Sequence, residues 1–137
     1  MATKIIPHGV VYFLSEITAD SQHMIGRSVR VNGTLLEYDA HANRAVIEHE
    51  GARLLVDTSL LGVFPHRERS LFQWIGEISV SDEHTAAAPL ILRARVVRNI
   101  DGLDLRLYEQ AVRLRRRFER SSRRQSDQSG TGIAGSV

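Results

Sequence analysis

Arginine is the residue type whose number and spacing most clearly indicate a chemical role in this sequence. Seven arginines and one glutamate lie between residues 113 and 124, a net charge of +6, whereas the rest of the chain holds 11 basic and 15 acidic side chains, a net of −4. A protein that binds a phosphate backbone on its own usually has a basic body. We therefore expect any affinity of this chain for nucleic acid to be weak or to depend on partners.

The arginine run itself has three interpretations. It is compatible with nucleic-acid binding, with a nuclear import signal and with a solvated helix face. The last is sufficient for Arg113, Arg116, Arg117 and Arg120, which lie off the apolar side of the helix predicted below.

A second set of candidates for nucleic-acid contact lies in the predicted strands. Arginine side chains follow a phosphate backbone and aromatic rings stack on bases. Trp74 alternates with Phe72 and Ile78 on one strand face, which favours a place in the core. The arginines are therefore preferred, although an ordinary solvated face would also explain them. The predicted nucleic-acid-binding residues are Arg30, Arg44, Arg93 and Arg95, ahead of Trp74, Tyr12, Tyr38 and Phe72.

Residue patterns typical of catalysis or metal binding are missing from the sequence. The six histidines never recur at three- or four-residue spacing, and neither GxSxG nor GxxxxGK[ST] occurs. There is no cysteine, which fits a reducing compartment. No apolar run is long enough to cross a bilayer. We expect a non-enzymatic protein with no catalytic residues, no metal site, no cofactor and no membrane contact.

Alternating apolar and polar residues predict five strands. In residues 28–38, Val29, Val31 and Gly33 alternate with polar neighbours, and the break at Leu35 and Leu36 suggests a bulge or bend near Gly33. A short helical turn is expected at 59–63. Five strands grouped three then two would expose edges unless the sheet closed. This favours a mainly β fold, a single OB-type barrel with a C-terminal helix, over an SH3-type barrel. The predicted strands are 28–38, 44–48, 53–56, 71–80 and 90–97.

The C-terminal region predicts a helix over about 104–119, with Asp104 at its N-cap. Its apolar residues fall on two separate faces, and a helix that lies only on its own barrel needs one. One face is the stripe Leu103, Leu107, Ala111, Leu114 and Phe118, whose spacing is typical of a helix that packs on another protein element. The other is the patch Leu105, Tyr108 and Val112. We expect the patch to dock on the barrel and the stripe to bind a partner.

The predicted domain organisation is one OB-fold domain with its C-terminal helix, residues 1–120, followed by a tail. Residues 121–137 are rich in serine, glycine and glutamine and poor in hydrophobes. Such a composition buries too little apolar surface to fold, so a disordered tail is expected there.

The segment GLDLRLYEQAVRLRRR (102–117), which follows RVVRNID (95–101), resembles the end of the Ten subunit, the smallest subunit of the telomere-capping CST complex. Residues 26–61 are similar to that family's first three strands, and LFQWIGEI (71–78) to its fourth. The resemblance covers roughly residues 10–120, and its most specific part is LDLRLYEQA.

This resemblance implies a single OB fold whose helix packs on the OB domain of the Stn subunit, in a pair similar to the two smaller subunits of replication protein A. The complex, with its large CST subunit, holds the single-stranded overhang of the chromosome end in the nucleus and helps to recruit DNA polymerase α–primase. Partner contacts carried over from the family fall on the stripe. The alternative is a small adaptor of the replication protein A type with no telomere role.

Overall fold

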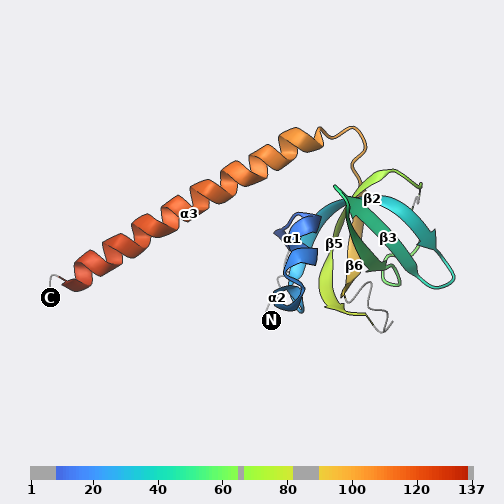
Figure 1. Ribbon diagram of the computed structural model, residues 1–137, viewed down its shortest axis with the longest axis horizontal. Helices are drawn as coiled ribbons and strands as arrows, with labels where there is room; N and C mark the ends of the chain where they lie inside the picture. The colour runs from blue at the N-terminus through green and yellow to red at the C-terminus, as the bar shows by residue number, and fades with distance from the viewer. Residues whose placement is uncertain (1–8, 65–66, 82–89, 136–137) are drawn as a thin grey trace, which may run out of the picture. The chain divides into compact units, whose positions relative to one another are not determined.

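The computed structural model describes residues 9–64, 67–81 and 90–135, with side chains up to Ser122. The chain forms two compact units, residues 1–101 and residues 102–137. The first holds the strands and two short helices, and the second holds one long helix (Figure 1). Each unit is described by itself.

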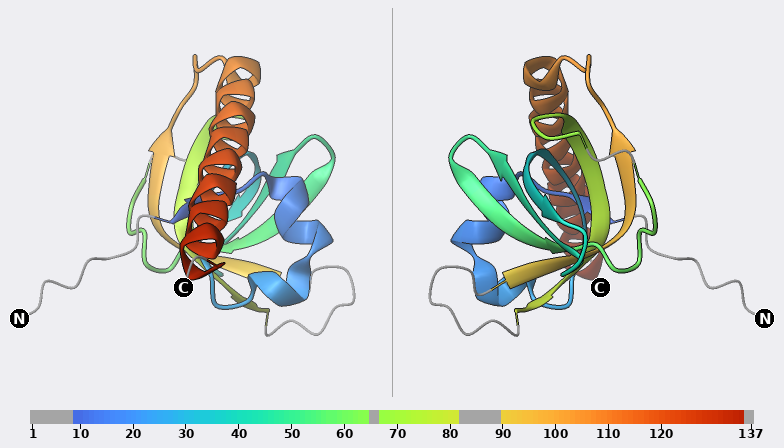
Figure 2. Two further views of the ribbon diagram at one scale, coloured as in Figure 1. Left: turned by 90° about the vertical axis from the view of Figure 1, so that its left-hand side faces the viewer. Right: turned by 90° about the vertical axis from the view of Figure 1, so that its right-hand side faces the viewer.

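Five strands close into a barrel in the first unit. β2 pairs with β3, β3 with β4, β4 with β6, β6 with β5, and β5 returns to β2 (Figure 2). All these pairings are antiparallel except that of β4 with β6. The predicted OB-type barrel, three strands followed by two, is confirmed. The strands are β2 Ser28–Asp39, β3 Arg44–His49, β4 Ala52–Asp57, β5 Leu71–Val80 and β6 Leu90–Asn99.

Strand β2 closes the barrel because it serves two neighbours in turn. Its residues 28–34 pair with β5 and its residues 34–39 pair with β3. The register against β3 shifts between Leu35 and Glu37, which is the predicted bulge. A bulge bends a strand and increases its twist, so this bulge lets β2 pass from its pairing with β5 to its pairing with β3.

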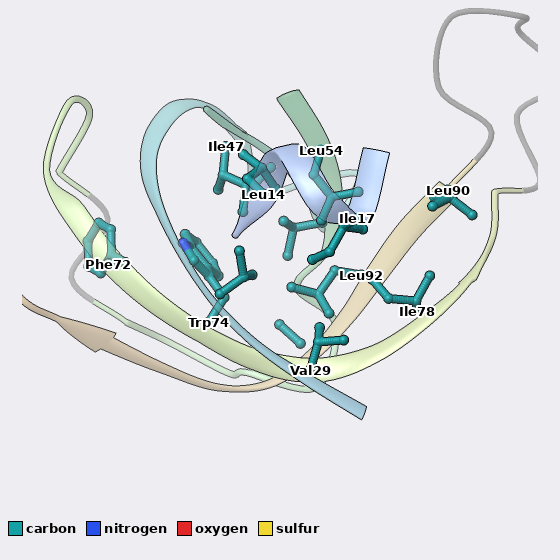
Figure 3. Packing of buried hydrophobic residues seen from close by; sticks show 14 of the residues in the cluster. Leu14, Ile17, Val29, Ile47, Leu54, Phe72, Trp74, Ile78, Leu90 and Leu92 are labelled. Atoms are coloured by element: carbon teal, nitrogen blue, oxygen red, sulfur yellow. The ribbon is translucent and has the colours of Figure 1, made fainter. Parts of the chain in front are cut away.

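The N-terminal elements were not predicted. β1, Val10–Val11, adds a parallel pair to β2, and two short helices follow, α1 Leu14–Ala19 and α2 Ser21–Met24. Helix α1 places Leu14 and Ile17, both completely buried, into the barrel beside Ile47 and Leu54 (Figure 3). One end of the barrel core is therefore filled by α1.

The connector between β4 and β5 contains a turn where one is predicted. The expected helical turn at 59–63 is a single hydrogen-bonded turn, in which the Leu61 N–H donates to the Thr58 carbonyl over 3.1 Å. Phe64 is buried just before the undescribed residues of this connector. Its ring packs edge-on against that of Trp74, with 6.2 Å between the two ring centroids. The connector therefore contributes a core aromatic and no regular helix in its described residues.

Trp74 lies in the centre of the core, as its alternation with Phe72 indicates. It is completely buried, its ring centroid is 5.5 Å from that of Phe72, and its indole N–H donates to the Gly33 carbonyl over 3.3 Å. A fully covered ring with its only donor satisfied is not available for stacking on a base.

The second unit is helix α3, Leu105–Gly135. The Asp104 carboxylate caps it by accepting from the Leu107 N–H over 3.1 Å, which confirms the predicted cap. The helix continues beyond the predicted end near residue 119, to Gly135. The predicted boundary at residue 120 is thus not a boundary of secondary structure. That residues 121–137 lack stable order in solution stays a prediction.

Among the described residues, no helix is both long enough and apolar enough to span a membrane.

Candidate binding surfaces

The predicted partner-binding stripe is exposed on α3. The exposed fractions of Leu107, Leu114 and Phe118 are 62%, 64% and 74%, and Ala111 between them is also exposed. At 3.6 residues per turn these four residues lie within about 60° of the helix circumference. They form one continuous apolar strip along three turns, which we call the α3 stripe.

Leu103, the first residue of the predicted stripe, lies just outside the helix. The helix begins at Leu105 and Asp104 is its N-cap, so Leu103 precedes the helix and does not follow its 100° spacing. It is 42% exposed. Leu103 therefore extends the apolar surface only as a neighbour of the helix start, and the α3 stripe proper begins at Leu107.

The second predicted patch is less exposed than the α3 stripe. Leu105, Tyr108 and Val112 are half-buried, and their common face lies about 120° around the helix from the α3 stripe. The two apolar faces of the sequence prediction are thus two distinct faces of the helix. That the patch docks on the barrel stays a prediction.

The exposure of the α3 stripe has an energetic consequence. Covering a leucine or phenylalanine side chain contributes roughly 1.5–3 kcal/mol relative to leaving it in water. Contiguous exposed apolar residues of this kind mark interaction sites. The three large side chains of the stripe could therefore supply several kcal/mol to an association, and the helix offers them on one side.

Two of the predicted nucleic-acid-binding arginines meet at one carboxylate. Asp57, at the end of β4, has Arg44 Nη1 at 3.7 Å from Oδ1 and Arg93 Nε at 4.0 Å from Oδ2. Burial alone would raise the pKa of Asp57, but hydrogen bonds from Ser59 and the charges of Arg44 and Arg93 outweigh it and lower the pKa below its usual value. The pair Arg44 and Arg93 is thus partly neutralised.

The other two, Arg30 and Arg95, lie on β2 and β6. Arg95 donates from Nη2 to the Ser28 hydroxyl over 3.0 Å, and Arg30 is half-buried opposite Ile75. The structure places Arg93 and Arg95 two residues apart on β6, Arg44 on β3 and Arg30 on β2. Their contact with nucleic acid stays a prediction.

Asp57 is a neighbour of two candidate arginines that the sequence analysis does not single out. Its position was recognisable as the residue after the predicted third strand, directly opposite Arg44 in the β3–β4 meander. An outward acidic residue facing an outward basic one across two strands is the cross-strand pairing that stabilises sheets. Arg53 and Glu48 form the same kind of cross-strand pair at the other end of the β3–β4 hairpin, where Arg53 Nε lies 2.8 Å from Glu48 Oε2.

Comparison with known proteins identifies the family. The family of telomere-capping CST complex subunits, Ten1, matches residues 5–122, which include the barrel and the α3 stripe. The chain belongs to this family. The CST complex subunit TEN1 of Arabidopsis thaliana is 34% identical over 119 residues, which are 86% of this chain and 91% of that protein.

Solved structures agree with the fold. The crystal structure of telomere capping protein Ten1 from Saccharomyces pombe has a TM-score of 0.63 at 16% identity, covering 80% of this chain and 98% of that one. A chain of the S. pombe Stn1–Ten1 complex gives the same TM-score at 17% identity, with 80% and 92% covered. These similarities support the barrel with its C-terminal helix as the fold of the family member described here.

Proposed function

We propose that this chain is the small OB-fold subunit of a CST-type complex and binds an Stn-type OB subunit as a heterodimer through the α3 stripe. It is non-enzymatic in this role. The observation that carries the proposal is the exposed, regularly spaced strip Leu107, Ala111, Leu114 and Phe118 on a helix of a Ten1-family chain. The S. pombe relative was crystallised as an Stn1–Ten1 complex, which supports a partner of this class.

The wider role follows from the family. A Ten1-family subunit paired with an Stn-type subunit would join the large CST subunit, hold single-stranded telomeric DNA in the nucleus, and support end protection and replication through DNA polymerase α–primase. The description of the matching family, telomere capping, supports this assignment.

DNA binding by the isolated chain is proposed to be weak. Outside residues 113–124 the chain carries a net charge of −4, and two strand arginines share a carboxylate. Non-specific binding of this kind has a Kd on the order of 1–100 μM at physiological salt. Truncation of residues 121–137 should weaken it further, because Arg123 and Arg124 are then lost.

The experiment is co-purification from cells of the organism that encodes this chain, with the full chain as bait. Recovery of an Stn-type OB subunit at equal stoichiometry supports the proposal. Recovery of a replication protein A subunit in its place would identify the chain as a general replication adaptor. A chain that emerges alone at physiological salt contradicts the heterodimer.

A further inference from the structure

Arginines occupy a third face of α3, separate from both apolar faces. Arg106, Arg113, Arg117 and Arg120 lie within about 60° of the circumference at 3.6 residues per turn, about 120° from the α3 stripe. All four side chains are exposed. The run of arginines is therefore sorted onto one side, which we call the α3 basic face.

The positive charge of this face is only partly balanced by the acidic residues of the helix. One carboxylate, Glu109, borders it, whereas Glu119 lies elsewhere on the helix and accepts from Arg115 Nε over 3.2 Å. Over its whole length α3 carries eight arginines and three acidic residues. Positive potential therefore accumulates along one side of the rod.

Three arginines of the strands lie beside carboxylates. Arg44 and Arg93 share Asp57, and Arg53 contacts Glu48 at 2.8 Å. An arginine with a carboxylate neighbour must give up part of that interaction to neutralise a phosphate, so it contributes less to binding. Arg44, Arg93 and Arg53 are therefore weakened as phosphate sites.

We infer that the α3 basic face binds the phosphate backbone of single-stranded nucleic acid while the α3 stripe holds the protein partner. This inference rests on the proposed function, because it leaves the α3 stripe to the protein partner. From Arg106 to Arg120 the face extends about 21 Å at 1.5 Å per residue, which is long enough to contact several successive phosphates. Because the two faces are separated, both ligands can be bound at once.

The test compares the salt dependence of binding to a 20-nucleotide oligothymidylate for the full chain and two triple variants of equal net charge. The helix variant carries Arg106→Gln, Arg117→Gln and Arg120→Gln. The strand variant carries Arg44→Gln, Arg93→Gln and Arg95→Gln. For a single strand the slope of log K against log salt is about −0.7 per phosphate neutralised, so the helix variant should lose about 2 from its magnitude. The strand variant should change it by clearly less.

Thermal unfolding of each variant verifies that the barrel is intact, and the single variant Arg93→Gln replaces the strand triple if the latter unfolds. Partner co-purification is measured in parallel and should be unchanged in the helix variant, so failure here is distinct from failure of the proposed heterodimer. An unchanged slope in the helix variant would overturn the inference, as would a larger loss in the strand variant. Binding of polyglutamate of matched charge as tightly as the oligonucleotide would also overturn it, by assigning the face to an acidic protein.

Discussion

At the scale of single residues, Gly76 has the least room for a side chain among the described glycines from Gly9 to Gly102. A Cβ built there would lie 2.2 Å from the Arg93 carbonyl oxygen and 2.8 Å from the Ala94 Cα, at the register shift between β5 and β6. Both neighbours are backbone atoms of the paired strand, so they cannot move without opening the barrel. Gly76→Ala should lower the free energy of unfolding by about 3 kcal/mol or more, as measured by chemical denaturation.

Gly51→Ala is the matched control for that prediction. Gly51 has a φ of +84° but open space around its Cβ position, so alanine there costs only the left-handed backbone, about 1 kcal/mol. Equal losses for the two variants would mean that the close approach at Gly76 does not limit the barrel.

Asp57 predicts a pH dependence of stability. Its pKa is lower in the folded chain than its ordinary value of 3.8, so the ionised carboxylate stabilises the fold above about pH 3.8, and this contribution is lost as the pH falls through the lower, folded-state pKa. Asp57→Asn should therefore reduce the free energy of unfolding at pH 6, and the difference from the original chain should shrink below pH 3.8. Denaturant titrations at pH 6 and pH 3 measure it.

Glu37→Gln removes an exposed carboxylate from β2 and should change the unfolding free energy little at either pH. A deficit of Asp57→Asn that persists undiminished at pH 3 would show that the amide disturbs packing and that the charge is unimportant.

Single residues also show which contacts can be predicted from the sequence and which cannot. Trp74 was assigned to the core because it alternates with apolar neighbours, and the structure buries it completely. The link of Arg44 and Arg93 through Asp57 was not predicted, because it depends on the parallel pairing of β4 with β6. Periodicity reveals which side of a strand a residue occupies, but it does not reveal which distant strand lies beside it.

At the scale of elements, α1 contributes buried side chains to one end of the barrel core. Ile17 has no exposed surface and packs with residues of several strands. Ile17→Ala leaves a cavity and should lower the free energy of unfolding by about 2–5 kcal/mol in denaturant titrations. Ser15→Ala, on the exposed side of the same helix, should change it by less than about 0.5 kcal/mol. A small effect of Ile17→Ala would mean that the barrel core is complete without α1.

Helix α3 should be stable only in part. Its first turns are capped by Asp104 and rich in leucine and arginine, whereas residues 121–135 contain three glycines and several serines, which favour helix poorly. Amide hydrogen exchange of the isolated chain should therefore be fast throughout 121–135 and slower across 107–118. Equal protection along the whole helix would contradict the predicted disorder of the tail.

The elements differ in how readily they can be predicted from the sequence. The five strands and the start of α3 were predictable because alternation, turn residues and the Asp104 cap are local signals. Helix α1 was not predicted because its six residues, of which two are buried, are too few to establish a helical periodicity. The end of α3 was placed too early because propensity alone, without a proline or a C-terminal cap, marks no definite stop.

At the scale of the whole molecule, the chain consists of a closed barrel and a helix with three different faces. The barrel satisfies its own core and pairs several of its own charges. The helix presents the α3 stripe, a half-buried apolar patch and the α3 basic face in turn around its axis. Such a division predicts that substitutions on α3 change association, whereas substitutions in the barrel change folding.

The most direct test of the central claim is the Kd between the full chain and its Stn-type subunit, measured by calorimetry for Leu114→Glu and for Arg113→Gln. Both substitutions lower the net charge by one, but Leu114 lies in the α3 stripe and Arg113 lies on the α3 basic face. Truncating or charging a large apolar side chain at an interface centre typically costs about 2–4 kcal/mol, so Leu114→Glu should weaken binding roughly thirtyfold or more. Arg113→Gln should change it less than about threefold, and both variants should melt at the temperature of the original chain. Unchanged binding by a folded Leu114→Glu variant would contradict the account.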